Sequence, residues 1–322
     1  MKNLLNKKNL VSLVLLVIIF FVFDYLIKAR ILTPYYRTVL YWMGIYIILS
    51  LGLNIIIGIT GQLSLGHAGF MSIGAYSAAV VLASNPTITG LFIGMGVGIV
   101  LTMIVSFIVA MPTLRLKGDY LAIATLGVGE IIRIVILNMT ITNGASGISN
   151  IKMLMSWPLL FGFVVLTIFL TNNFKQSAIG RACIAIKEDE IAAEAMGINT
   201  TKYKVMAFMF GAVLASVAGS LFATTYYVVK PETFGVNTSI NILIIVVFGG
   251  MGSLSGSIIS TIFIGFVNMA LQPYAEMRLI SYALVLIIVM IFRPQGLMGA
   301  KEVALNVLPD FKSFFRKKEK SS

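Results

Sequence analysis

Charged residues are scarce in this chain. Lys, Arg, Asp and Glu together make up 11% of its 322 residues, whereas a soluble domain carries about 25%. Hydrophobic residues make up 58%. So few charges cannot cover the surface of a protein dissolved in water. The composition therefore predicts that lipid surrounds most of the chain.

Cysteine and histidine are scarcer still, with Cys183 and His67 as single examples. One cysteine excludes an intrachain disulfide, and one histidine excludes a metal site built from several histidines. The sequence also lacks a G-x-x-x-x-G-K-[ST] phosphate loop, an H-E-x-x-H zinc motif and a nucleophile elbow. We therefore expect no metal, no cofactor and no nucleotide site in this chain, which argues against an enzyme.

The charge that is present has mostly one sign, and the formal net charge is +12. In a soluble protein this excess would suggest nucleic acid as a partner. In a membrane protein, Lys and Arg gather in cytoplasmic loops and tails, and this interpretation is favoured here. Residues 293–322 fit a basic cytoplasmic tail that contacts membrane lipid at the inner leaflet.

Long apolar runs recur along the chain, and a membrane helix needs about 20 such residues. We expect an all-α, polytopic membrane protein with about ten transmembrane segments. The run 10–27 is expected to be a retained helix, because no small-residue cleavage site follows it. The expected spans are 10–27, 38–57, 66–83, 90–111, 120–137, 157–171, 205–229, 239–271 and 277–292.

Two glycine-rich stretches, 58–69 and 248–256, interrupt the apolar pattern. The run 239–271 is too long for one span, so we expect two short helices that meet at the second stretch. Irregular backbone at membrane depth needs cover from protein or water, and broken helices often mark a transport pathway. The candidate pathway residues are Gln62, Ser64, His67 and Ser253, although for His67 a helix-packing role is favoured.

Glu130 and Arg133 are charges expected inside a membrane span. They are three residues apart, so they share one face of a helix and can pair. Charges in a membrane usually line a pathway or pair internally. Both residues are therefore candidates for the pathway, and a structural ion pair is slightly favoured.

Loop charges indicate the topology. With the N-terminus inside, the polar stretch 172–204 and the basic tail both fall on the inner side. Lys28, Arg30 and Arg37 oppose this assignment, because they would face outward.

Several stretches, in this order, resemble the branched-chain amino acid permeases of ATP-binding-cassette importers, of the LivM type. The resembling stretches are 61–70 (GQLSLGHAGF), 118–127 (GDYLAIATLG), 142–148 (TNGASGI), 179–199, 249–256 (GGMGSLSG) and 292–297 (FRPQGL). The resemblance runs from about residue 38 to residue 298, and the first helix region carries no motif of the family. It implies a multi-pass permease of a bacterial cytoplasmic membrane that translocates leucine, isoleucine or valine, and we expect residues 1–322 to form one transmembrane permease domain.

The resemblance also implies partners: a second permease subunit of the LivH type, two cytoplasmic ATPase subunits that hydrolyse ATP, and an external substrate-binding protein. It makes 172–204 the ATPase-docking loop, with Glu190, Glu194, Ala195 and Gly197 as candidate contacts. Independently, the alanine-rich acidic pattern predicts a short helix that ends at Gly197. A solvated linker helix is the alternative.

Other functions stay open at this point. Related permeases carry urea, amides or other amino acids, and the pathway residues give no chemical code for the substrate. A secondary transporter driven by an ion gradient is a further alternative. It is disfavoured, because Glu130 is the only clear acid at membrane depth and a docking loop would have no purpose there.

Overall fold

The computed structural model describes residues 7–271 except 115 and 117, together with 284, 287 and 296–299, and side chains from residue 16 onward. The described part is an all-α fold in which one isolated antiparallel bridge joins Ile148 and Val229. The helices are α1 (Lys7–Lys28), α2 (Pro34–Asn54), the π-helix η1 (Ile55–Ile59), α3 (His67–Ser84), α4 (Ile88–Thr113), α5 (Asp119–Asn138), η2 (Thr140–Thr142), η3 (Gly144–Ser146), α6 (Trp157–Gln176), α7 (Ala178–Glu188), α8 (Glu190–Ala195), α9 (Thr200–Thr225), η4 (Pro231–Phe234), α10 (Val236–Gly249) and α11 (Leu254–Ala270).

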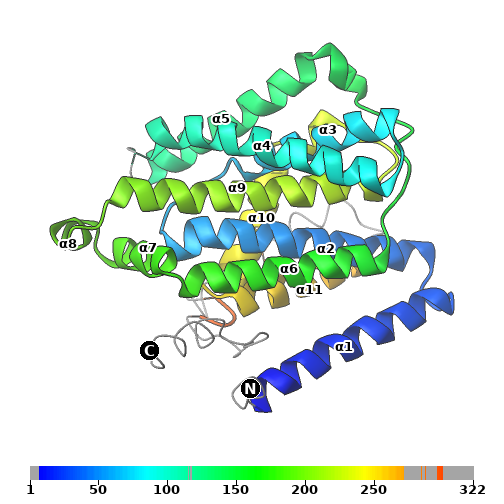
Figure 1. Ribbon diagram of the computed structural model, residues 1–322, viewed down its shortest axis with the longest axis horizontal. Helices are drawn as coiled ribbons and strands as arrows, with labels where there is room; N and C mark the ends of the chain where they lie inside the picture. Colours follow the sequence, from blue (N-terminus) through cyan, green and yellow to red (C-terminus); the bar gives the residue numbers. More distant parts are fainter. Residues whose placement is uncertain are drawn as a thin grey trace, which may run out of the picture.

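The long helices lie side by side in a bundle, with α7 and α8 together at one end (Figure 1). We call this end the α8 end. Helices α2, α3 and α9 are mostly buried, whereas α4, α5 and α6 expose most of their length. The central helices therefore pack against protein on nearly all sides, and the outer ones present apolar side chains to their surroundings.

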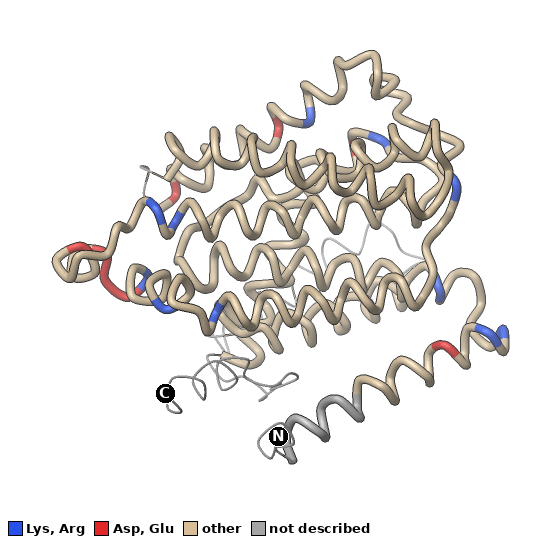
Figure 2. Tube along the Cα trace, in the orientation of Figure 1, with Lys and Arg blue, Asp and Glu red and all other residues tan. Residues whose placement is uncertain are grey.

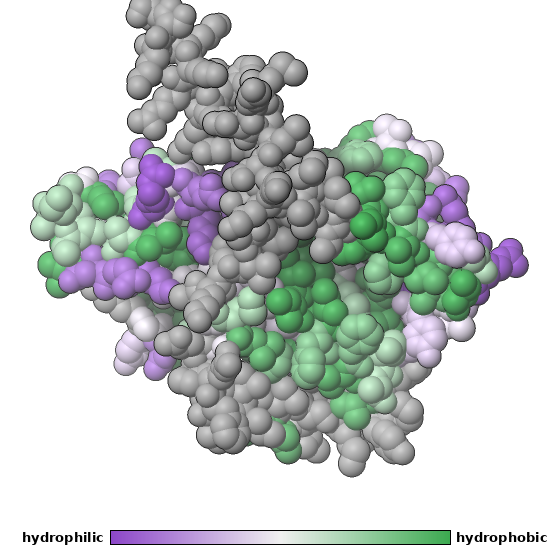
Figure 3. All heavy atoms as spheres, turned by 90° about the horizontal axis from the view of Figure 1, so that it is seen from below, coloured by the Kyte–Doolittle hydropathy of each residue, from purple (hydrophilic) through white to green (hydrophobic). Residues whose placement is uncertain are grey.

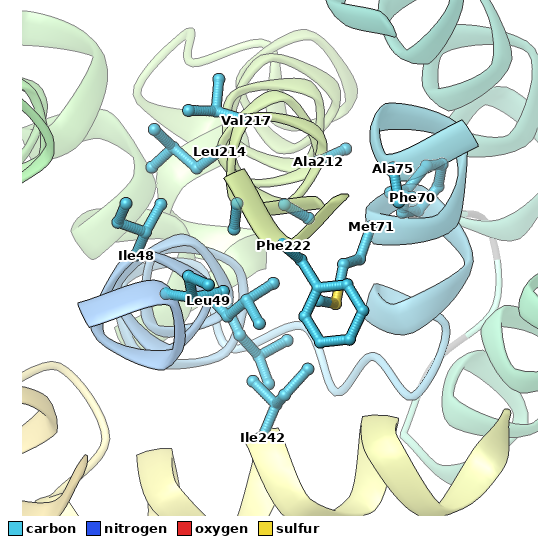
Figure 4. Close-up of a cluster of buried hydrophobic side chains, with 14 of the residues drawn as sticks. Ile48, Leu49, Phe70, Met71, Ala75, Ala212, Leu214, Val217, Phe222 and Ile242 are labelled. Atoms are coloured by element: carbon cyan, nitrogen blue, oxygen red, sulfur yellow. The ribbon is translucent and has the colours of Figure 1, made fainter. Parts of the chain in front are cut away.

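The core fills the space between α2, α3, α9 and α10. Glycines let α3 and α9 approach closely, because a Cβ at Gly74 on α3 would overlap the Ser216 carbonyl on α9, and a Cβ at Gly219 on α9 would overlap the Met71 carbonyl on α3. Apolar side chains from the four helices meet there (Figure 4). They include Ile48, Leu49, Phe70, Met71, Ala75, Ala212, Leu214, Phe222 and Ile242.

The surface has the pattern of a membrane protein. Charged residues gather toward the ends of the bundle, apart from an acidic and a basic residue partway along α5 (Figure 2). Seen from below, hydrophilic residues lie at the two ends of the visible face and hydrophobic residues lie between them (Figure 3). Apolar side chains on α4, such as Phe92, Val100 and Ile108, are about half exposed, as lipid contact requires.

The expected count of ten segments is not confirmed. Six described helices are long and apolar enough to cross a membrane: α3, α4, α5, α6, α9 and the continuous unit Pro34–Ile59. Helices α10 and α11 are apolar but shorter. The expected first span lies within α1, which is not one of the six. The expected last span, 277–292, and the basic tail lie almost entirely outside the described residues.

Two interruptions of the helices matter for function. The first break is residues 58–67, which run from the last turn of η1 through the loop 60–66 to the first residue of α3. The second break is residues 250–253, between α10 and α11. Each falls within one of the two glycine-rich stretches of the sequence. In both, one helix runs to the α8 end and the next helix leads back from it.

Candidate functional site

The first break ends at the N-terminus of α3, whose backbone donors are satisfied by neighbouring helices. The Leu65 N–H donates to the Thr125 hydroxyl of α5 at 3.0 Å, and the Ala68 N–H donates to the Ser239 hydroxyl of α10 at 3.1 Å. A helix start normally finds its cap within its own chain segment, but Gly66 has no side chain to offer. Helices α5 and α10 therefore fix the position at which α3 begins.

Glycines allow α5 to lie directly against the first break. A Cβ at Gly69 would be 2.8 Å from the Gly129 Cα, and a Cβ at Gly66 would overlap the Thr125 carbonyl. Any larger residue at these positions would push α5 away. Two glycines of the GQLSLGHAG segment, Gly66 and Gly69, are therefore explained by the contact with α5.

The same break holds polar side chains that are buried and unpaired. Gln62, Ser64 and His67 are each at most 3% exposed. Within the described part of the chain, both amide atoms of Gln62, the Ser64 hydroxyl and both ring nitrogens of His67 have no hydrogen-bond partner. The His67 ring lies near the Leu49 carbonyl but forms no hydrogen bond of normal geometry with it.

Buried polar atoms without a hydrogen-bond partner destabilise a folded protein. Burying one polar group without a partner costs about 1–3 kcal/mol on protein scales, so native structures seldom leave several together. The five unpaired atoms of the first break therefore point to a partner outside the described residues, such as water or a passing solute.

The second break contains polar side chains that are paired. Asn54 on α2 donates to the Ser253 carbonyl and to the Ser257 hydroxyl, both at 2.7 Å, and accepts from the Gly252 N–H at 2.7 Å. The Ser253 hydroxyl accepts from the Gly256 N–H at 3.0 Å and so caps α11. Ser253, a pathway candidate from the sequence, is fully buried and has this capping role.

The two breaks touch each other at the α8 end. A Cβ at Gly58, in the last turn of η1, would overlap the Gly252 N–H and the Asn54 side chain. Two lysines reach the same place: Lys187 Nζ donates to the Gly58 carbonyl at 2.9 Å, and Lys175 Nζ donates to the Gly252 carbonyl at 2.7 Å. We call this contact, made by Asn54, Gly58 and Gly252, the break joint.

Glu130 and Arg133 pair with each other on α5. The Arg133 Nη2 and Nε atoms lie 2.7 and 2.8 Å from the Glu130 Oε2 atom. Their side chains are about one quarter exposed, and the nearby Gly235 lies beside both. The pair is therefore internal to one helix, and no contact joins it to Gln62, Ser64 or His67 among the described residues.

At the α8 end, α8 is a short, well-capped helix. The Asp189 carboxylate accepts from the Ile191 and Ala192 N–H groups at 2.9 and 3.0 Å. The helix stops at Gly197, which has a φ of +82°, and the Ile198 N–H closes the turn on the Ala193 carbonyl at 3.0 Å. The helix end expected at Gly197 is confirmed in this geometry, which favours glycine.

The carboxylates of the predicted docking segment already have partners within the chain. Glu190 pairs with Lys204 at 2.6 Å, and the Thr200 hydroxyl donates to Glu194 at 2.7 Å. The exposed face of the segment is apolar instead: Ile191 is 79% exposed and Met196 is 83% exposed, next to exposed Ala195. This exposed apolar face is a candidate contact surface.

Helix α7 joins this segment to the bundle. Its N-terminus is capped by the Ser177 hydroxyl, which accepts from the Gly180 N–H at 3.1 Å. Cys183 faces inward, and its burial raises the pKa of the thiol to about 11. The single cysteine is therefore packed into the fold and poorly reactive near neutral pH.

Several residues of these sites were not predicted from the sequence: Asn54, Lys175, Lys187, Ile191 and Met196. Asn54 could have been noticed, because it is a lone amide inside an apolar run. Among the described residues, no cluster of three or more metal-binding side chains occurs.

Comparison with known proteins decides the family. A family model described as "Branched-chain amino acid transport system / permease component" matches residues 35–293. The chain belongs to this family. The resemblance inferred from the motifs is thereby confirmed, and the chain is a multi-pass membrane permease of a branched-chain amino acid transport system rather than an enzyme.

Individual relatives agree with this assignment. The permease is 36% identical to the high-affinity branched-chain amino acid transport system permease proteins LivM of Salmonella typhimurium and of Escherichia coli, over 79% of this chain and 68% of each relative. It is 34% identical to the corresponding LivH protein of Escherichia coli over 151 residues, which cover 46% of this chain and 47% of LivH. No solved structure matches it.

Proposed function

We propose that this permease is the membrane subunit of an ATP-driven importer of leucine, isoleucine and valine in a cytoplasmic membrane. Its similarity to LivM over 79% of the chain carries the proposal. The expected assembly contains a second permease subunit of the LivH type, two ATPase subunits that hydrolyse ATP, and an external binding protein. The α8 end faces the cytoplasm in this assembly.

The α8 segment is the proposed contact with the ATPase. A short helix transmits a rigid-body movement only if its ends are fixed, and α8 is fixed by Asp189 at its start and Gly197 at its end. The exposed Ile191 and Met196 would enter an apolar groove of the ATPase. Glu190 and Glu194 hold α8 in position through Lys204 and Thr200 instead of reaching the partner themselves.

The first break is the proposed wall of the translocation pathway. Gln62, Ser64 and His67 supply donors and acceptors that no group of the described chain uses. An amino acid crossing the membrane must exchange water for such groups around its ammonium and carboxylate ends. Because an external protein delivers the substrate, these contacts can be weak and still guide it.

Uptake measurements test the substrate. A strain that lacks the gene should lose high-affinity uptake of radiolabelled leucine, isoleucine and valine, and a plasmid copy should restore it. Urea uptake is measured in parallel, because related permeases carry urea. Normal uptake of the three amino acids together with lost urea uptake would contradict the proposed substrate.

Copurification tests the energy source. Tagged permease should retain the ATPase after detergent extraction, and the double variant Ile191→Glu, Met196→Glu should lose it. Ile141→Glu is the matched control, because Ile141 is also exposed, at 63%, but lies on η2, away from α8. An importer that works without any bound ATPase and stops when the ion gradient is collapsed would contradict the proposal.

A further inference from the structure

The break joint is held by two lysines that belong to neither break. Lys175 lies in the last turn of α6 and Lys187 in the last turn of α7, and each donates to a backbone carbonyl of the joint. The Gly58 carbonyl lies in the last turn of η1, where carbonyls lack partners within the helix. The Gly252 carbonyl lies in the turn between α10 and α11, and a lysine amine is a strong donor for both carbonyls. These lysines therefore close the α8 end of both breaks.

The joint itself is one unit. Asn54 on α2 is hydrogen-bonded to both sides of the second break, and the backbones of Gly58 and Gly252 are in contact. If either lysine is withdrawn, the joint loses a charge-assisted hydrogen bond, which is stronger than a neutral one. Lys187 binds the first break at the Gly58 carbonyl and Lys175 binds the second break at the Gly252 carbonyl, so both act on the same contact.

The lysines also bracket α7, the helix that connects the bundle to α8. Only Ser177 separates α6 from α7, and only Asp189 separates α7 from α8. Helix α7 is about 16 Å long at 1.5 Å per residue, and it packs on α9 and η1. Helix α7 therefore links α8 directly to Lys187 and, through its hydrogen bond, to the Gly58 carbonyl.

We propose that Lys175 and Lys187 are positioning residues that latch the break joint shut, and that movement of α7 and α8 releases the latch and opens the first break. The inference rests on the proposed function, because the ATPase would supply the movement. The latch itself exists without the ATPase and can be measured separately.

The test uses a cysteine reporter in the first break, Ser64→Cys, in membrane vesicles that contain the full importer. Ser64 is 2% exposed and its hydroxyl has no partner, so the exchange removes no hydrogen bond. The native Cys183 is buried and stays silent. A small maleimide, applied from the side of α8, reports how often the break opens.

Lys175→Met and Lys187→Met, each combined with the reporter, should raise the labelling rate on the order of tenfold, because each removes one hydrogen bond from a charged donor. Lys187→Arg keeps a charged donor and should label close to the wild-type rate. Lys202→Met is the matched control, since Lys202 is an exposed lysine at the start of α9. Unchanged labelling in both Lys→Met variants would overturn the latch.

A second measurement needs no variant and covers the case in which the Lys→Met proteins do not accumulate. In nucleotide-free wild-type importer, an amine reagent should modify Lys175 and Lys187 on the order of tenfold more slowly than Lys202, because their amines are hydrogen-bonded. Equal rates would overturn the latch. A slow reaction that ATP does not accelerate would leave the latch standing and count against the ATP-driven function.

Discussion

The two breaks look alike in the sequence and differ in the fold. Both are short, rich in glycine and serine, and placed where one helix reaches the α8 end and the next leads back. In the first break, Gln62, Ser64 and His67 leave five buried polar atoms unpaired among the described residues. In the second, Ser253 and Asn54 are hydrogen-bonded. The second break is therefore a structural joint, and the first keeps its polar groups available for a transient partner.

The largest effect is expected where the breaks touch. Gly58→Ala would place a methyl group on the Gly252 backbone and the Asn54 side chain, and overpacking of this kind costs about 1–3 kcal/mol or more. The amount of folded permease after detergent extraction should fall sharply. Gly96→Ala on α4 is the control, because nothing lies within 4 Å of its Cβ position. Equal yields of the two variants would mean that the breaks do not need this contact.

Removal of Asn54 should have the next largest effect. Asn54→Leu keeps the size of the side chain but leaves the Gly252 N–H and the Ser253 carbonyl without this partner. A buried group left unsatisfied costs about 1–3 kcal/mol. The Tm of the purified permease should therefore fall, as measured by fluorescence-detected size exclusion after heating. An unchanged Tm would remove the distinction between the two breaks.

Replacement of a polar side chain by an apolar one in the first break should have the opposite effect on the Tm. Gln62→Met removes polar atoms that have no partner, so the Tm should stay equal or rise. Uptake should fall by about two- to tenfold, the equivalent of one hydrogen bond to the substrate or its water. A fall in Tm without an effect on uptake would make Gln62 a structural residue like Asn54.

The smallest effect is expected from a labelling experiment that reports on which side of the membrane the α8 end, where both breaks meet, is exposed. Cys183 should stay unlabelled by an impermeant maleimide from either side, because it is buried, so it cannot report topology. Met196→Cys, at an 83% exposed position, should react from the cytoplasmic side only. Labelling in intact cells would place the α8 end outside.

The thiol of Cys183 also predicts a pH dependence. Burial raises its pKa from about 9 to about 11, so the neutral thiol is the form favoured by the fold. Its contribution to stability is complete below pH 9 and is lost as the pH rises toward 11. The Tm of the purified permease should therefore fall in that interval and be insensitive to this group below it.

The sequence predicted the fold class, the end of α8 and the short helices near 239–271 well, because hydropathy and glycine report on local structure. It could not separate the two breaks, since the pairing of Asn54 depends on residues about 200 positions away. Lys175 and Lys187 look like ordinary loop charges of a membrane protein. Their carbonyl partners become visible only when α6, α7 and the two breaks are placed in space.

The first helix, α1, differs from the rest of the bundle in its packing and in its relation to the family. Aromatic rings join it to α6: Phe20 packs on Phe161, Phe23 packs on Trp157, and the Trp157 indole donates to the Phe20 carbonyl at 3.2 Å. The family model begins at residue 35, beyond this helix. Helix α1 is thus a flank element that the bundle carries beside α6, outside the residues shared with the family, and its removal would leave the two breaks and their joint with all the contacts described above.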